Sequence, residues 1–257
     1  MSEFLLTEDR EGVRLLTLNR PEKKNAINNE MWLALTEAFT AADADDRVHC
    51  LVFTGAGGNF SAGVDLSSFG DGDAGSASEH PFGACARAVA AFGKPWIGAA
   101  SGIAVGGGAT VLFHADICYI GESLRMRLPF ASLGLPPEFA SSYMLQANIG
   151  AQQAAELFYT AEWIDAARAI ETGIAARCYP EDLLLTAAME KAAEIAQWPV
   201  NALREIKATL RLPHRESIAA AFKLEDEAMA RQAGSAENIE AIMAFMEKRP
   251  PNFRDLG

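Results

Sequence analysis

The chain has 257 residues, half of them hydrophobic and 22% charged, which is the composition of a globular protein with a full core. Its 34 acidic and 22 basic side chains give a formal net charge of -12, which argues against a nucleic acid or an anionic membrane as partner. No window is apolar over the length of a membrane span, and the start, MSEFLLTEDREG, has acids where a signal peptide needs bases. We therefore expect a cytoplasmic protein.

The first 145 residues alternate strand patterns with helix patterns, with glycine at the turns from strand to helix. Strands are expected at 12–20, 48–55, 95–104 and 117–122, and helices at 28–45 and 86–93. Residues 70–81 have loop composition. From residue 150 onward the pattern is mostly helical, over 151–160, 165–173, 183–198 and 217–248. The sequence predicts an α/β fold with a core over 1–195 and a helical C-terminal region over 196–257, both in one structural unit.

The four cysteines are Cys50, Cys85, Cys118 and Cys178, widely spaced and without a CxxC pair. This spacing favours reduced core thiols over a disulfide framework or a zinc site. We expect no metal site.

Two glycine turns each follow a strand and open a helix: FSAGVD (60–65) and GGGA (106–109). Glycine lets a ligand approach the backbone, and two free N–H groups that converge form an oxyanion hole. Either turn alone is more typical of tight packing than of catalysis.

In this order the two turns carry a resemblance. FSAGVDL followed by GKPWIGAASGIAVGGGATVLFHADICYIGE resembles the crotonase (enoyl-CoA hydratase/isomerase) superfamily, from LNRPEKKNAINNEM to the final AFMEKRPPNF. The resemblance implies a spiral of β-β-α turns with a helical C-terminal trimerisation region. It also implies a homotrimer or dimer of trimers, an acyl-CoA thioester substrate and no separate cofactor.

The resemblance assigns the oxyanion hole to the backbone amides of Val64 and Gly107. Hydratases of the family carry two glutamates, at positions that are Thr110 and Phe130 here. Hydration needs a water to be deprotonated and a proton to be delivered to C2, so we expect no hydratase activity. The resemblance assigns substrate contacts to Lys24, Ala26, Ala62, Gly63, Asp65, Leu66 and Phe130.

Glu138 stands in an apolar stretch, RLPFASLGLPPEFASSYML. The segment is similar to that of the peroxisomal-type Δ3,Δ2-enoyl-CoA isomerases, in which a lone glutamate is catalytic. Moving a double bond from C3 to C2 needs one carboxylate that removes a C2 proton and returns one at C4. Apolar neighbours would raise its pKa toward neutrality. The alternative is that Glu138 is a first-turn residue that interacts favourably with the helix dipole.

The sequence therefore predicts an isomerase that converts 3-enoyl-CoA to trans-2-enoyl-CoA in fatty acid metabolism, with Glu138 as proton shuttle. The alternatives are another crotonase-type enzyme, such as a dienoyl-CoA isomerase or a hydrolase, and a catalytically silent acyl-CoA-binding protein. A second acid would separate the enzymes, and Glu79 and Glu122 are the nearest loop candidates.

Other polar residues favour structural roles. Asp65 is typical of a helix cap, and His114 of a buried core histidine. Lys23 and Lys24 are as typical of a solvated loop as of a contact with the CoA phosphates. Lys248 and Arg249 are weaker candidates for that contact, on a neighbouring subunit's CoA.

Overall fold

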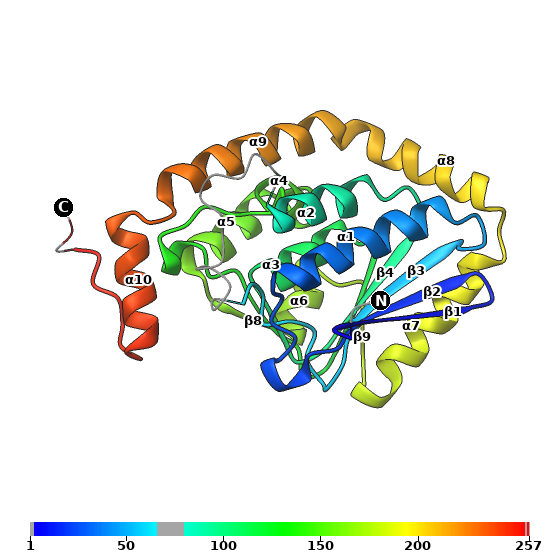
Figure 1. Ribbon diagram of the computed structural model, residues 1–257, viewed down its shortest axis with the longest axis horizontal. Helices are drawn as coiled ribbons and strands as arrows, with labels where there is room; N and C mark the ends of the chain where they lie inside the picture. The colour runs from blue at the N-terminus through cyan, green and yellow to red at the C-terminus, as the bar shows by residue number, and fades with distance from the viewer. Residues whose placement is uncertain (1–2, 66–79, 255, 257) are drawn as a thin grey trace.

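A six-stranded sheet forms the centre of the computed structural model, which describes residues 3–65, 80–254 and 256 (Figure 1). Its strand order is β1-β2-β3-β4-β6-β9, and β1 pairs antiparallel with β2 while the other neighbours are parallel. The strands are β1 (Leu5–Arg10), β2 (Val13–Leu18), β3 (Cys50–Gly55), β4 (Trp96–Ala100), β6 (Ile117–Gly121) and β9 (Arg177–Tyr179). Strands β1 and β9 were not predicted from the sequence.

A second sheet of three short strands has the order β5-β7-β8, formed by β5 (Ile103–Val105), β7 (Arg125–Arg127) and β8 (Trp163–Asp165). The single strand predicted over 95–104 is wrong, because β4 and β5 belong to different sheets. Gly102 lies between them with φ of +55°, a left-handed conformation that turns the chain.

Helices cover both faces of the main sheet. The helices of the described part of the chain are α1 (Asn29–Ala44), α2 (Pro81–Ala91), α3 (Gly107–Thr110), α4 (Ser141–Ile149), α5 (Ala151–Thr160), α6 (Ala166–Thr172), α7 (Glu181–Ala196), α8 (Val200–Arg211), α9 (Arg215–Gln232) and α10 (Ala236–Met246). The single stretch predicted over 217–248 is two helices, α9 and α10, separated at Gly234, whose φ is +79°.

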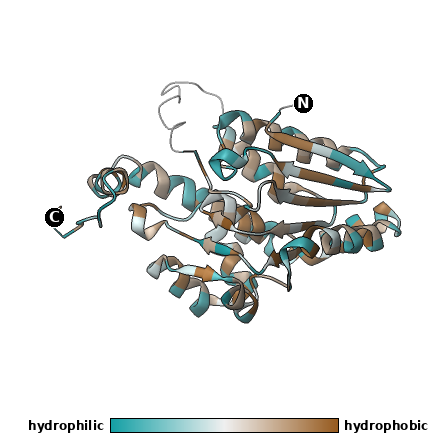
Figure 2. Cartoon of the chain, turned by 90° about the horizontal axis from the view of Figure 1, so that it is seen from below, coloured by the Kyte–Doolittle hydropathy of each residue, from teal (hydrophilic) through white to brown (hydrophobic). Residues whose placement is uncertain are grey.

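Strand β3 shows why the sheet is buried on both faces. Successive side chains of a strand point to opposite sides. Leu51 and Phe53 join the larger core cluster, with α1 and α2, whereas Cys50 and Val52 join a second cluster with α7. Figure 2 shows these hydrophobic strands between the helices. The helices on the two faces of the sheet hold the ends of the strands in place. The predicted site residues begin in the turns that follow these strand ends.

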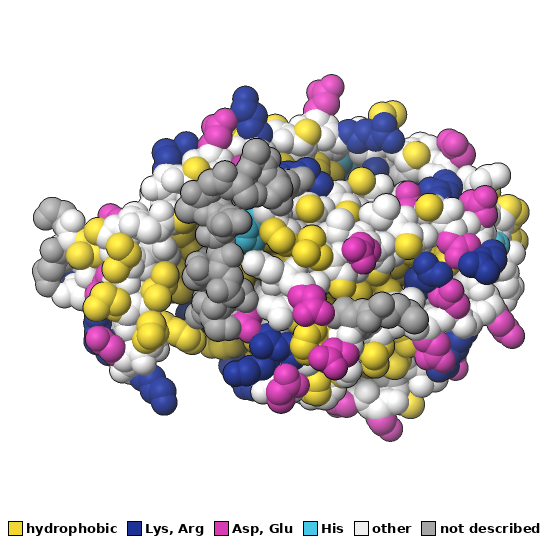
Figure 3. Space-filling model, viewed as in Figure 1, with side chains coloured by type: hydrophobic (Ala, Val, Ile, Leu, Met, Phe, Trp, Pro, Cys, Tyr) yellow, Lys and Arg dark blue, Asp and Glu magenta, His cyan; other side chains and the backbone are white. Residues whose placement is uncertain are grey.

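The last three helices extend away from this core. In Figure 1, α8 and α9 run one after the other across the molecule, and α10 lies at the far end. Hydrophobic side chains gather over α10 in Figure 3. Phe245 and Met246 of this helix are exposed. The predicted division at residue 195 remains a prediction.

Two further features bear on the expectations above. No helix in the described part of the chain is both long and apolar enough to cross a membrane. Cys50, Cys85 and Cys118 are buried free thiols, but the prediction of a core position is wrong for Cys178, which is exposed. Cys178 lies on β9, the last strand of the sheet, so its neighbours cover it on one side only.

Candidate active site

The first glycine turn, residues 61–65, lies against the short strand β5. The Ser61 amide donates a hydrogen bond to the Ile103 carbonyl (2.9 Å), and the Ser61 carbonyl accepts one from the Val105 amide (3.0 Å). Gly63 has φ of +88°, and a Cβ there would lie 2.4 Å from the Val105 carbonyl oxygen. Only glycine fits this contact.

The second glycine turn begins where β5 ends. Gly106 has φ of 52° and ψ of -126°, and α3 starts at Gly107. A Cβ on Gly63 would lie 3.7 Å from the Gly107 nitrogen, so the two turns are neighbours. Within the described part of the chain, neither the Val64 nor the Gly107 amide donates a hydrogen bond to the protein. Two available amides in one small site are what an oxyanion hole requires.

Asn25 and Ser61 brace the first turn, although the sequence analysis did not single them out. Asn25 is fully buried, and its side-chain amide donates to the carbonyls of Ala56 (2.9 Å) and Asn59 (2.7 Å). The backbone carbonyl of Asn25 accepts a hydrogen bond from the Ser61 hydroxyl (2.8 Å). The Ser61 hydroxyl oxygen in turn accepts one from the Gly63 amide (3.1 Å). This chain of hydrogen bonds fixes the backbone that precedes Val64.

Arg20 and Asp65 form a second brace. The Arg20 guanidinium donates to the Asp65 carboxylate at 2.5 Å and to the Ala26 carbonyl at 3.1 Å. Both charged side chains are largely buried, at 15% and 14% exposure, so water screens the pair weakly. The predicted cap role of Asp65 concerns residues that lie outside the described part of the chain.

Most of the predicted substrate-contacting residues lie together in the structure. The Ala62 amide donates to the Lys24 carbonyl (2.9 Å), and Val64 forms a β-bridge with Ile27. The side chains of Lys23 and Lys24 are exposed.

Two of the predicted contacts remain apart from this group. Leu66 lies outside the described residues. Phe130 is buried, with its ring centroid 6.1 Å from that of Phe158 on α5.

The carboxylate of Glu138 reaches the second glycine turn. A Cβ built on Gly107 would lie 3.3 Å from Glu138 Oε1, 3.3 Å from Trp32 Cη2 and 3.4 Å from Phe82 Cε2. The rings of Trp32 and Phe82 contact each other edge to face, with centroids 5.0 Å apart. A carboxylate and two aromatic rings therefore enclose Gly107.

The backbone that carries Glu138 is strained and held from outside. Helix α4 begins only at Ser141, so the reading of Glu138 as a first-turn residue is wrong. Phe139 and Ala140 have φ of +66° and +53°, a left-handed conformation that costs about 1–2 kcal/mol per residue other than glycine. The Phe139 carbonyl accepts from His114 Nε2 (2.7 Å).

Glu225 of α9 provides a second hold on this segment. Its carboxylate accepts from the amides of Ala140 (2.6 Å) and Ser142 (2.8 Å). Glu225 was not predicted as a site residue, and no local signal in the sequence indicates it, because a glutamate in a long polar helix normally faces solvent.

Burial sets the protonation of this cluster. Desolvation, followed by repulsion from the Glu225 charge, raises the pKa of Glu138 to about 8. Burial lowers the pKa of His114 to about 4, so its ring is neutral at pH 7 and Nε2 carries the hydrogen donated to Phe139. The expected core position of His114 is confirmed, since it is fully buried. Glu138 is thus poised to take up and release a proton near neutral pH.

Within the described part of the chain, neither the two hydratase positions nor Glu122 adds a carboxylate to this cluster. Thr110 and Phe130, at the two hydratase positions, are buried and neutral, and the Thr110 hydroxyl has no hydrogen-bond partner within the described part of the chain. Glu122 is exposed in the turn after β6, where its amide donates to the Tyr179 carbonyl. Glu79 lies outside the described residues.

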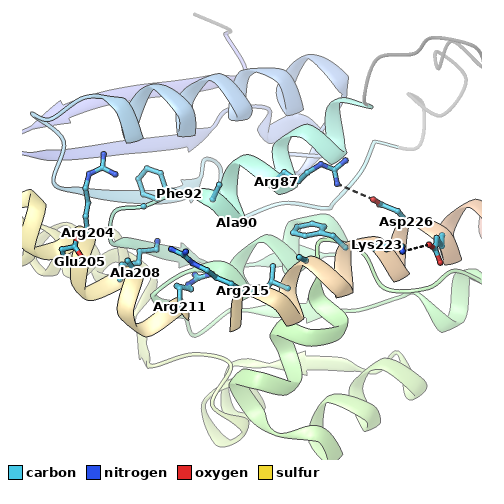
Figure 4. Close-up of a pocket in the computed structure, with 17 residues that line it drawn as sticks. Arg87, Ala90, Phe92, Arg204, Glu205, Ala208, Arg211, Arg215, Lys223 and Asp226 are labelled. Carbon is cyan, nitrogen blue, oxygen red and sulfur yellow. Dashed lines mark hydrogen bonds and ion pairs between the residues drawn. The ribbon is translucent and has the colours of Figure 1, made fainter. Parts of the chain in front are cut away.

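A groove of about 1020 Å³ lies elsewhere, between α2, α8 and α9 (Figure 4). Its basic residues are Arg87, Arg204, Lys207, Arg211, Arg215 and Lys223. Several of these charges are paired with acids, as in Lys207–Asp116 (2.8 Å) and Arg87–Asp226 (3.4 Å). The residues that line the groove do not include the glycine turns or Glu138.

Comparisons with known proteins agree with this geometry. Residues 8–256 match the family model described as enoyl-CoA hydratase/isomerase. The chain is 32% identical to the 1,2-epoxyphenylacetyl-CoA isomerase of Escherichia coli (strain K12), over 98% of this chain and 99% of that protein. It is 31% identical to the 2,3-dehydroadipyl-CoA hydratase of the same organism, over 99% of both.

The fold agrees as well. The crystal structure of an enoyl-CoA hydratase/isomerase from Pseudoalteromonas atlantica T6c superposes with a TM-score of 0.93 at 33% identity, over 97% of this chain and 99% of that one. The predicted fold class is confirmed: strands, glycine turns and C-terminal helices define a crotonase-type acyl-CoA enzyme. The chain belongs to the enoyl-CoA hydratase/isomerase family.

Proposed function

We propose that this protein shifts a double bond from 3-enoyl-CoA to trans-2-enoyl-CoA, with Glu138 as the only proton carrier. The observation that carries the proposal is that Glu138 Oε1 lies 3.3 Å from where a Cβ on Gly107 would stand, and the Gly107 amide has no partner within the described chain. A thioester oxygen held by the amides of Val64 and Gly107 would bring its C2 close to Glu138. One such donor is typically worth about 3 kcal/mol of transition-state stabilisation.

The chemistry balances with one carboxylate. Glu138 removes a proton from C2, the C2–H electrons form the C1=C2 bond of a dienolate, and the C1=O π electrons move onto the thioester oxygen while the C3=C4 bond stays in place. The protonated Glu138 then delivers the proton to C4, where the C3=C4 electrons bind it, the C1=C2 electrons become the C2=C3 bond, and the oxygen re-forms the C1=O bond. Because the carboxyl group ends as it began, no water or redox partner takes part.

The pKa of about 8 supports this role. A shuttle must accept a proton from carbon and give it up again, and a carboxyl group near neutrality does both more readily than one at its ordinary value of 4.5. The neighbouring Trp32 and Phe82 rings support the proposal, because they exclude water from the enolate.

Hydration is the second candidate, because the names of similar proteins include hydratases. Thr110 and Phe130 argue against hydration, because both side chains are neutral and occupy the two positions at which hydratases of the family carry glutamates. Glu225 is already engaged by two backbone amides. A dienoyl-CoA isomerase, a hydrolase or a silent acyl-CoA-binding protein remains an alternative outcome of the experiment below.

We also propose assembly as a homotrimer or a dimer of trimers. Exposed apolar side chains on α10 support self-association, with Phe245 and Met246 at 64% and 75% exposure (Figure 3). Light scattering coupled to gel filtration should give three or six times the 27.5 kDa chain mass. A monomer over a wide concentration range would contradict the assembly.

The activity is tested with purified protein and 3-enoyl-CoA esters of short, medium and long acyl chains. We expect an ultraviolet signal from the conjugated 2-enoyl thioester, and a product with the same mass as the substrate. Failure with every chain length, together with normal acyl-CoA binding, would favour the silent binding protein. A product 18 mass units heavier would favour hydration.

A further inference from the structure

Glu225 is a carboxylate buried on a helix that is otherwise largely exposed. Helix α9 has two buried residues, Ala221 and Glu225, and Glu225 retains 5% exposure. A buried carboxylate is costly unless it is hydrogen-bonded. Here both oxygens are used, on the amides of Ala140 (2.6 Å) and Ser142 (2.8 Å).

Those two amides flank the start of α4. The N-cap residue of this helix is Ala140, which has no side-chain oxygen to satisfy the free amides at a helix start. Glu225 supplies that function from another helix, 85 positions away in the chain. It therefore links α9 to the segment that begins with Glu138.

The same contact fixes an unfavourable backbone. Phe139 and Ala140 both have positive φ, and such residues persist only where the surroundings over-determine them. Phe222, one turn before Glu225 on α9, stacks on His114 with ring centroids 6.4 Å apart, and His114 holds the Phe139 carbonyl. Two side chains of α9 thus act on the two residues that follow Glu138.

We propose that Glu225 is a positioning residue for Glu138. Glu225 holds the left-handed Phe139–Ala140 backbone so that the Glu138 carboxylate faces Gly107. The inference rests on the proposed function only where turnover is concerned. The hydrogen bonds and the backbone conformation stand without it.

The charge of Glu225 adds a second effect. Its repulsion contributes to the raised pKa of Glu138, after desolvation. Loss of that charge should therefore lower the Glu138 pKa. The other titratable or charged groups near Glu225 and its hold on α4 are Asp226 with its partner Arg87, the neutral His114, and the hydrogen-bonded Tyr143–His214 pair.

The test compares Glu225→Gln, Glu225→Ala and Glu227→Gln. A glutamine oxygen still accepts one of the two amide hydrogen bonds, whereas alanine accepts neither. Glu227→Gln removes the same charge from the same helix at an exposed position that pairs only loosely with Lys223 (4.0 Å), so it serves as control. Kinetics are measured with 3-enoyl-CoA below the melting temperature of each variant.

We expect kcat to fall about 10-fold in Glu225→Gln and about 100-fold in Glu225→Ala, with KM changed less than 3-fold, as for groups that act on the transition state. The acid limb of the pH profile should move to lower pH in both. Glu227→Gln should match the wild type. A lower melting temperature with unchanged kcat and pH profile would make Glu225 merely structural and overturn the proposal.

A readout without turnover separates this inference from the proposed function. Carbodiimide coupling with an amine labels protonated carboxyl groups, and mass spectrometry of the peptide that contains Glu138 gives its labelling as a function of pH. We expect the midpoint to move to lower pH in Glu225→Gln and to stay in place in Glu227→Gln. An unmoved midpoint would overturn the electrostatic link, whether or not the protein isomerises 3-enoyl-CoA.

Discussion

Gly63 faces Val105 so closely that a Cβ on Gly63 would lie 2.4 Å from the Val105 carbonyl oxygen. This contact sets the first glycine turn against the second. Gly58 offers a comparison, because its φ of +72° resembles the +88° of Gly63, yet no atom lies within 4 Å of its Cβ position. The two glycines share a left-handed backbone, but only at Gly63 would a Cβ also meet a neighbouring part of the chain.

Gly63→Ala should therefore displace the Val64 amide, while Gly58→Ala should not. We expect kcat/KM for 3-enoyl-CoA to fall about 100-fold in Gly63→Ala, the typical effect of losing one oxyanion donor. Gly58→Ala should lose about 1 kcal/mol of stability with normal kcat/KM. Equal kinetics in the two variants would contradict the role of the first turn.

Lys24 should contribute to binding of the CoA moiety and not to proton transfer. Its side chain is exposed and its carbonyl holds Ala62, so Lys24→Ala removes a charge without disturbing the turn. We expect KM for 3-enoyl-CoA to rise about 2- to 5-fold with unchanged kcat, the size of a solvent-exposed ion pair. An N-acetylcysteamine thioester, which lacks the CoA phosphates, serves as control and should show no such rise. An equal rise in KM for both substrates would contradict a contact between Lys24 and the CoA phosphates.

Hydration of 2-enoyl-CoA should be at least about 100-fold slower than isomerisation, because a second positioned carboxylate is absent at Thr110 and Phe130. Thr110→Glu should introduce measurable hydration, and Thr110→Gln should not. Phe130 is less suitable for substitution, since it packs against Phe158 in the core. Hydration by the wild-type protein at a rate similar to isomerisation would contradict the single-carboxylate account.

Local patterns in the sequence were sufficient for most of the sheet. Alternation predicted β2, a short β-branched run that ends in glycine predicted β3, and helical spacing predicted α1. The cap of α1 is Asn28, whose side-chain oxygen accepts from the Met31 amide (2.9 Å). The two glycine turns and Glu138 are likewise visible as short motifs, because each depends on neighbours in the chain.

Features that depend on distant contacts were not predictable. The separation of β4 from β5 follows from the left-handed conformation of Gly102. The continuous apolar run PWIGAASGIA gives no sign of this turn. Glu225 reads as a solvated helix residue until α9 is placed over α4. Asn25 reads as a turn residue, although its side chain is buried and ties residues 56 and 59 to the loop before α1.

Glu138 should also make stability depend on pH. Its pKa is raised from an ordinary 4.5 to about 8, so between these values the folded protein binds more protons than the unfolded chain. Stability should therefore fall as pH rises through this window. In urea titrations, Glu138→Gln should gain stability over the wild type between pH 5 and pH 8. A constant difference between the two proteins would mean that the Glu138 pKa is close to that of a free carboxyl group.

The central claim, that one partly buried glutamate moves the proton, is tested most directly by the pH dependence of kcat/KM for 3-enoyl-CoA in the wild type and in Glu138→Gln. Because the base must be deprotonated, the wild-type rate should rise with pH along a limb centred near pH 8. In Glu138→Gln the rate should be lower by about 10²–10⁴-fold and that limb should be absent, while acyl-CoA binding persists. A wild-type rate that stays flat down to pH 4.5, or near-normal turnover in the variant, would contradict the account.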